Sequence, residues 1–213
     1  MSILFGYTKD NKRIHIRDYD FDVHGIVLCD QGHEVICKRG EKRLSHFCHK
    51  KLVDNCVGSK MSDWHLAHQN RIKDDYLEIP IGNNRADIRN LDNVVIELQN
   101  SPISKEEIRE REKAYGNMVW IFNFFKNDIS ITKQDGRLLY FDITKGPMYM
   151  FDVRKQLFLD EGKIGMLEVI EHKKKKCIAK VWTLEEIDQY LFKGILKDDA
   201  DKRLERHKYK IDF

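Results

Sequence analysis

The sequence predicts an α/β fold built around a mixed β-sheet. Residues 94–99 alternate apolar and polar side chains, which is the period of a β-strand, and residues 84–89 precede them as a second strand. Residues 104–115 carry the end signals of a helix, and the apolar run at 118–124 is typical of a buried strand. The order strand, strand, helix, strand indicates an α/β domain.

The first 58 residues predict a small β-rich module. Residues 26–29 and 34–37 have the composition of short strands, and the turn residues 30–33 between them predict a hairpin. We therefore expect a separate N-terminal domain at residues 1–58.

Cysteine and histidine side chains are dense in and after this hairpin. Cys29 and His33 belong to it, and His46 and His49 follow. Such a density predicts a tetrahedral zinc site, with His33 as the preferred fourth ligand and Cys48 as its rival. The alternative is that the cysteines are ordinary buried residues and the histidines are polar or contact phosphate. The spacing leaves both interpretations open.

Residues 59–126 contain the predicted core. Ser59 or Ser62 is expected to cap a helix that runs to about residue 73. His65 lies on an apolar stripe of this helix, where a histidine is usually a core residue. Four strands are then predicted, at residues 75–81, 84–89, 94–99 and 118–124.

The hairpin formed by the middle two strands places two carboxylates and an amide side by side. Glu97 and Gln99 share one face of their strand, and Asp87 lies on the neighbouring strand. Carboxylate and amide oxygens suit a hard cation such as Mg²⁺ or Mn²⁺. The alternative is that the acids only face water. Ile96 and Leu98 demand burial, however, and favour an interior strand.

The loop of this hairpin decides whether the acids meet. Opposed residues in an antiparallel hairpin have a constant sum of positions, so Asp87 opposite Glu97 requires Asn90 opposite Val94. A three-residue loop follows, and its last residue, Asn93, tolerates the left-handed conformation that such loops need.

The helix at residues 104–115 begins with a capping box and ends before a glycine. Its Ile108, Arg111 and Tyr115 fall on one stripe. An arginine on an apolar stripe either extends past the core to solvent or faces an anion, and the sequence does not decide between these two interpretations for Arg111.

These residues resemble the competence protein CoiA-like family, a branch of the PD-(D/E)XK nuclease superfamily. The matching pieces occur in one order along the chain: residues 85–87, 96–101, 103–104, Arg111 with Tyr115, and 119–121. The resemblance implies a restriction-endonuclease-like core, a mixed sheet flanked by helices, in which Asp87 and Glu97 bind the metal. Gln99 stands where the superfamily usually has lysine. The CoiA-like branch resembles this sequence in carrying glutamine at that position.

The resemblance also reaches the flanks of the core. It implies that His65 acts near the metal, although Gln69 stands where a lysine tends to follow it. It supports a small metal-bound N-terminal module that ends in a His-Phe-x-His signature. The chain departs from the family after Cys29, where Cys-x-x-Cys is expected and Gly32-His33 is found.

Residues 127–213 predict a β-rich C-terminal extension with a terminal helix. Strands are expected at 138–141, 148–151, 157–159 and 166–170, and a helix at 183–192. The basic run at 173–176 is read as a solvated hairpin tip in preference to a phosphate contact.

The composition limits the class of protein and the compartment in which it is expected. Hydrophobic residues make up 41% of the 213, and 38 basic residues against 35 acidic ones leave a net charge of +3, so bulk charge does not argue for nucleic acid. Apolar runs are too short to span a bilayer, and no signal peptide is recognisable. Five cysteines without such a signal indicate a reducing compartment, the cytoplasm or a nucleus.

The sequence thus predicts a Mg²⁺- or Mn²⁺-dependent deoxyribonuclease, an endonuclease, with a structural Zn²⁺ in its N-terminal module. Asp87, Glu97, Gln99 and His65 are the expected catalytic residues. Arg85, Arg111 and Tyr115 are expected to bind DNA, without excluding RNA. The competing hypothesis is a catalytically degenerate module that binds nucleic acid or serves in assembly. Sequence preference and oligomeric state are not predicted.

Overall fold

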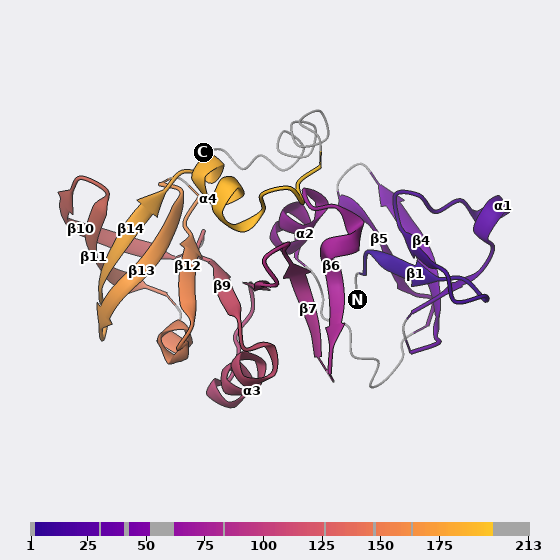
Figure 1. Ribbon diagram of the computed structural model, residues 1–213, viewed down its shortest axis with the longest axis horizontal. Coiled ribbons are helices and arrows are strands. Elements are labelled where there is room, and N and C mark those ends of the chain that lie inside the picture. Colours follow the sequence, from indigo (N-terminus) through magenta and orange to yellow (C-terminus); the bar gives the residue numbers. More distant parts are fainter. Residues whose placement is uncertain are drawn as a thin grey trace. The chain divides into compact units, whose positions relative to one another are not determined.

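The computed structural model describes residues 3–29, 31–40, 43–51, 62–82, 84–125, 127–146, 148–162 and 164–197. The chain divides into two compact units, Met1–Leu66 and Ala67–Phe213 (Figure 1). Within the described residues, no helix is long and apolar enough to cross a membrane.

The first unit is a five-stranded antiparallel sheet with the order β2-β1-β3-β4-β5. Its strands are β1 (Phe5–Tyr7), β2 (Arg13–His15), β3 (Val27–Leu28), β4 (Glu34–Gly40) and β5 (Arg43–His49), with a short helix α1 (Phe21–His24). Val27 pairs with Val35, which confirms the predicted hairpin. Both valines are buried with Phe47.

The second unit is built on a nine-stranded mixed sheet with the order β10-β11-β14-β13-β12-β9-β8-β7-β6. In chain order its strands are β6 (Leu77–Ile81), β7 (Asn84–Arg89), β8 (Val95–Gln99), β9 (Met118–Asn123), β10 (Asp128–Asp135), β11 (Leu138–Lys145), β12 (Gln156–Asp160), β13 (Met166–Lys173) and β14 (Lys176–Trp182). The pairs β8–β9 and β9–β12 are parallel, and the other neighbouring pairs are antiparallel. The α/β class and the mixed sheet are therefore as predicted.

Strands β10 to β14 join the same sheet as the predicted core. The link is the parallel pairing of β12 with β9, in which Leu157 lies beside Trp120 and Asp160 beside Asn123. The boundary expected after residue 126 consequently falls inside one continuous sheet, and the division into units falls at residues 66/67.

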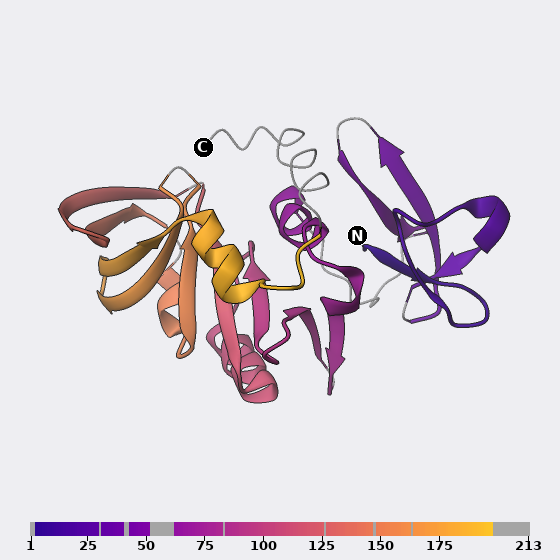
Figure 2. The same cartoon turned by 45° about the horizontal axis from the view of Figure 1, so that its top comes forward.

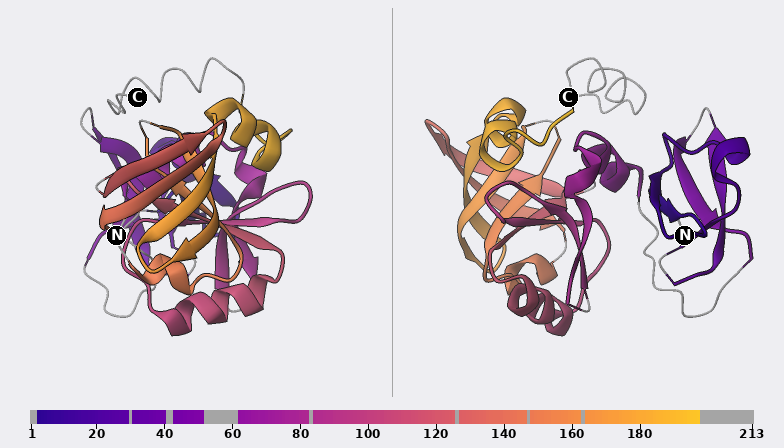
Figure 3. Two further views of the ribbon diagram at one scale, coloured as in Figure 1. Left: turned by 90° about the vertical axis from the view of Figure 1, so that its left-hand side faces the viewer. Right: turned by 45° about the vertical axis from the view of Figure 1, so that its right-hand side comes forward.

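Helices α3 (Lys105–Tyr115) and α4 (Leu184–Leu191) lie on opposite faces of this sheet (Figures 2 and 3). Ile108 of α3 belongs to the core that contains Trp120 and Leu157. The next residue of β12, Phe158, points to the other face and contacts Tyr190 of α4. The predicted N-cap Ser104 is confirmed, since its side chain accepts a hydrogen bond from the third residue of α3. Thr183 caps α4 in the same way, at the start of the predicted helix.

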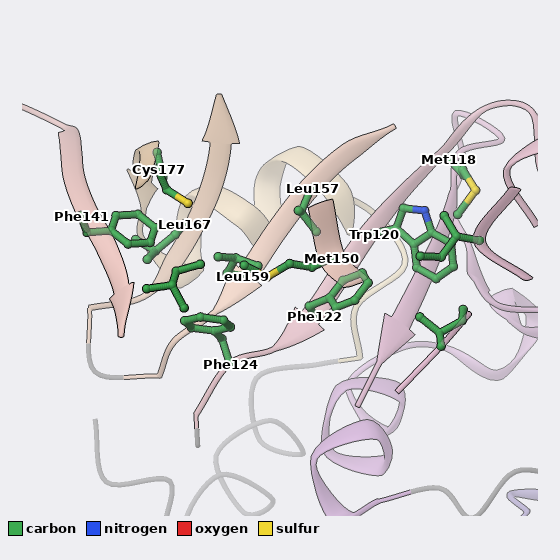
Figure 4. Close-up of a cluster of buried hydrophobic side chains, with 14 of the residues drawn as sticks. Met118, Trp120, Phe122, Phe124, Phe141, Met150, Leu157, Leu159, Leu167 and Cys177 are labelled. Atoms are coloured by element: carbon green, nitrogen blue, oxygen red, sulfur yellow. The ribbon is translucent and has the colours of Figure 1, made fainter. Parts of the chain in front are cut away.

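The main hydrophobic core runs along the α3 face of the sheet. Large side chains from neighbouring strands meet there, among them Trp120, Phe122, Leu157 and Leu159 (Figure 4). Met150 is also buried in this core, but it belongs to a 3-10 helix (Met148–Asp152). The strand predicted at residues 148–151 is therefore wrong, because an unbroken apolar run carries no period that separates strand from helix.

Helix α2 (Asp63–Asn70) connects the units in sequence. Ser62 caps it, because its Oγ accepts a hydrogen bond from the backbone N–H of His65 at 3.2 Å. The rival cap Ser59 lies outside the described residues, as does the tail after residue 197. In the second unit, the C-terminal end of α2 is tied to the chain around α4, because Arg71 forms an ion pair with Asp188.

Candidate functional site

The predicted register of the β7–β8 hairpin is confirmed. Ile88 pairs with Ile96, and the N–H of Asn90 donates to the carbonyl oxygen of Val94 at 3.0 Å. Asn93, the last residue of the three-residue loop, has φ 57°. The same constant sum of positions places Asp87 opposite Glu97.

At Asp87 and Glu97 the ordinary backbone ladder gives way to side-chain contacts. The N–H of Leu98 donates to Asp87 Oδ2 at 2.8 Å, and the N–H of Asp87 donates to Glu97 Oε1 at 3.3 Å. Each carboxylate thus accepts a backbone hydrogen bond from the opposite strand, and the two acids lie close together where the strands part.

Glu97 is buried beneath α3, with only 1% of its surface exposed. Arg111 Nη1 donates to its Oε2 at 2.5 Å, while Arg111 Nη2 donates to Glu107. Burial and the nearby charge of Asp87 raise the pKa of Glu97 to about 8, although Arg111 acts in the opposite direction. Burial, followed by the charge of Glu97, also raises the pKa of Tyr115. The stripe of α3 that the sequence singled out faces this acid.

A third acid, Glu78 on β6, joins the pair. Leu77 pairs with Ile88 and Ile79 with Ala86, so Glu78 stands opposite Asp87. Carboxylate oxygens of the two residues lie within 4.8 Å of each other. Sequence reasoning missed Glu78, because one polar residue in an alternating strand looks like a solvent-facing position. Only the pairing of three strands shows that Glu78, Asp87 and Glu97 form one row.

Gln69 on α2 contacts this row from the helix side. It is fully buried, and its Nε2 donates to Glu78 Oε1 at 2.6 Å and to the carbonyl oxygen of Asp87 at 3.3 Å. Its Oε1 is buried without a hydrogen-bond partner among the described residues. His65 precedes Gln69 by one helical turn and lies on the same side of α2.

The remaining predicted residues of the core are placed as follows. Gln99 is buried on the Glu97 face of β8, and its Nε2 donates to the carbonyl oxygen of Ser101 at 2.5 Å. Arg85 Nη1 lies 3.6 Å from a carboxylate oxygen of Glu78, with about a third of its side chain exposed. Both predicted arginines therefore contact an acid of the row.

In the first unit, Cys29, His33 and His49 come together. One potential ligand atom from each lies within 4.8 Å of the others, and Cys29 Sγ is 3.6 Å from His33 Nδ1. Burial and the neighbouring His33 lower the pKa of His49, which favours the neutral imidazole that binds metals. The three side chains form a group that can hold a metal ion.

His46 and Cys48 do not join that group by strand geometry. His49 pairs with Val35, while Cys48 pairs with Ile36 and His46 with Lys38. Alternation puts His46 and Cys48 on the face of β5 opposite to His49. The expected set of four ligands is therefore reduced to the three that meet.

A mixed sheet that carries a row of three acids, the buried Glu97 and the half-buried Asp87 and Glu78, defines an α/β domain with a centre suited to a hard cation. Comparison with protein families gives the more particular assignment. Residues 60–193 match the family described as competence protein CoiA, nuclease-like domain, and this span is more than half of the 213-residue chain. The chain belongs to that family. Comparisons with curated proteins and with solved structures find no match.

Proposed function

We propose that this protein is a metal-dependent nuclease that hydrolyses phosphodiester bonds in DNA, with a restriction-endonuclease-like core of the PD-(D/E)XK type. The observation that carries the proposal is the confirmed register, which sets Asp87 opposite Glu97 in a domain of a nuclease-like family. The two carboxylates supply hard oxygen ligands, which fit Mg²⁺ or Mn²⁺. Such an ion, when bound, polarises the scissile phosphate and lowers the pKa of the attacking water.

The side chains around the acids have separate tasks in this proposal. Arg111 holds the Glu97 carboxylate in place, and a carboxylate oxygen that accepts one hydrogen bond keeps another lone pair for a cation. Arg111 and Arg85 are each about a third exposed, and a guanidinium group with its five N–H donors suits phosphate oxygens. Tyr115, which follows Arg111 by one turn of α3, also contacts the Glu97 carboxyl group.

Gln99 and His65 complete the proposed catalytic set. The amide of Gln99 orients water or substrate through hydrogen bonds, but it cannot act as a general acid as a lysine does. His65 is assigned a role beside the metal because it shares a helix side with Gln69, which contacts Glu78.

One observation favours a second candidate, a non-catalytic module that binds nucleic acid. One N–H of the Gln99 amide is already engaged by the carbonyl oxygen of Ser101, so this position has no lysine and only one further amide N–H to offer. A degenerate module of this kind would show no Mn²⁺ affinity that depends on Asp87.

The proposal is tested by incubating the full chain with plasmid, linear, single-stranded and branched DNA and with RNA. We expect phosphodiester cleavage of at least one DNA substrate with Mg²⁺ or Mn²⁺, and none with a chelator. Binding of DNA without cleavage under every metal condition would instead support the non-catalytic module.

We also propose that the first unit binds Zn²⁺ through Cys29, His33 and His49. One thiolate and two imidazoles are typical zinc ligands. The role proposed for the ion is structural, because binding a metal at three points ties β3 and the following turn to β5.

Elemental analysis of protein purified without chelator should find close to one zinc per chain. Cys29→Ser and His49→Ala should lose it, because each removes one of three ligands. His46→Ala is the matched control, since His46 lies on the opposite face of β5 and should leave the zinc content unchanged. A well-folded parental protein without zinc would reduce these side chains to packing residues.

A further inference from the structure

We propose that Glu78 is a ligand of the same divalent cation as Asp87, and that Gln69 holds Glu78 in place and binds a water molecule of that cation. This inference rests on the proposed metal-dependent function. It extends the expected pair of metal-binding acids, Asp87 and Glu97, by a residue from a third strand.

The geometry gives Glu78 a central position. It stands opposite Asp87 in the β6–β7 pair, with carboxylate oxygens of the two within 4.8 Å. Its side chain is only 10% exposed. Two half-buried carboxylates this close repel each other, and a divalent cation between them removes that repulsion. Asp87 thereby becomes the middle acid of three, with Glu97 on its other side.

The backbone at Glu78 is held in a costly conformation. Its φ of 52° lies in the left-handed region, inside a strand where Leu77 and Ile79 keep their regular pairing with β7. A residue other than glycine is strained in this region, and such residues gather at functional sites. A glutamate that only faced water would need no such conformation.

Gln69 provides an independent observation. A carboxylate accepts hydrogen bonds and does not donate them, so the contact with Glu78 fixes the amide with Nε2 toward the acid. Oε1 is then left buried without a hydrogen-bond partner among the described residues. Such an acceptor costs free energy unless something donates to it. A water molecule bound to a cation at Glu78 and Asp87 is a donor of the required kind.

The two arginines at the row fit the same assignment. Arg111 contacts Glu97 and Arg85 lies 3.6 Å from Glu78, so each outer acid has a cationic neighbour. These arginines offset part of the negative charge of the metal-free row. The carboxylates of the row offer hard oxygen ligands, which favour Mg²⁺ or Mn²⁺.

The test measures Mn²⁺ affinity by calorimetry, and by the rise of the thermal unfolding midpoint on adding Mn²⁺, for the full chain and for Glu78→Gln. Glutamine keeps an oxygen that can accept from Gln69 but removes the charge. We expect at least about tenfold weaker Mn²⁺ binding and a smaller rise of the midpoint. Glu110→Gln, an exposed position of α3, is the matched control and should bind Mn²⁺ as the parent does.

Three results decide the question. Parental affinity in Glu78→Gln, with loss in Asp87→Asn, would overturn the role of Glu78 and leave the nuclease proposal intact. No Mn²⁺ binding by the parent would overturn both. If Glu78→Gln fails to fold, Glu78→Asp takes its place. It keeps the charge but shortens the reach, so unchanged Mn²⁺ affinity in that variant would count against the ligand role.

Discussion

Asp87→Asn should lose metal-dependent cleavage by at least about a thousandfold while the protein stays folded. Asp87 is the middle acid of the row, opposite Glu78 on one side and Glu97 on the other. The substitution removes a charged metal ligand, and a thousandfold loss corresponds to about 4 kcal/mol of transition-state stabilisation. The fold is expected to persist, because an asparagine oxygen can still accept the hydrogen bond from the N–H of Leu98.

The measurement is the initial cleavage rate at saturating Mg²⁺, together with circular dichroism and Mn²⁺ affinity. Asp92→Asn is the matched control. Asp92 is an exposed residue of the adjoining loop, and it contacts Asn90 through its backbone N–H and not through its carboxylate. Cleavage by Asp87→Asn at the parental rate would place the catalytic centre elsewhere in the chain.

The register of the β7–β8 hairpin could be predicted because it depends on local rules. The sum of positions, the three-residue loop and the tolerance of Asn93 for a positive φ all lie within a dozen residues. The helix α3 was predictable for the same reason. Its cap is set by neighbouring residues, and the stripe that carries Arg111 has the helical period.

Glu78 and Gln69 were not predictable in this way. The place of Glu78 depends on which strand pairs with β7 and on an unusual φ, and neither has a signal in the sequence. The contact of Gln69 depends on how α2 packs against that strand. The sequence shows Gln69 one turn after His65, but it shows neither the burial of Gln69 nor its contact with Glu78.

The number of strands that join the sheet could also not be predicted from local sequence patterns. Each of the strands β11 to β13 has an apolar run, yet nothing in those runs says that β12 returns to pair in parallel with β9. Parallel pairing joins segments that are distant in the chain, so it is decided by packing of the whole core and not by a turn. Trp120 and Leu157 meet only through that pairing.

Glu97→Gln should remove most of the pH dependence of stability in the metal-free protein. The pKa of Glu97 is raised from 4.5 to about 8 by burial and by Asp87, so the folded state holds its proton more tightly than the unfolded state does. The stability that the protonated carboxyl contributes is therefore fully present below pH 4.5 and is lost as the pH rises toward 8. The free energy of unfolding of the parent should therefore fall by on the order of 3 kcal/mol more than that of Glu97→Gln between pH 5 and 8.

Urea unfolding with a chelator present, repeated at pH 5 and pH 8, measures this difference. Glu107→Gln is the matched control, because Glu107 accepts from the same arginine but is about half exposed, so its variant should keep the parental pH dependence. At pH 8, adding Mn²⁺ should raise the stability of the parent, since a cation favours the ionised carboxyl group of Glu97. The same addition should not raise the stability of Glu97→Gln. Equal loss of stability in the parent and in Glu97→Gln would mean that Glu97 is already ionised beside Arg111, and that the arginine outweighs burial and the charge of Asp87.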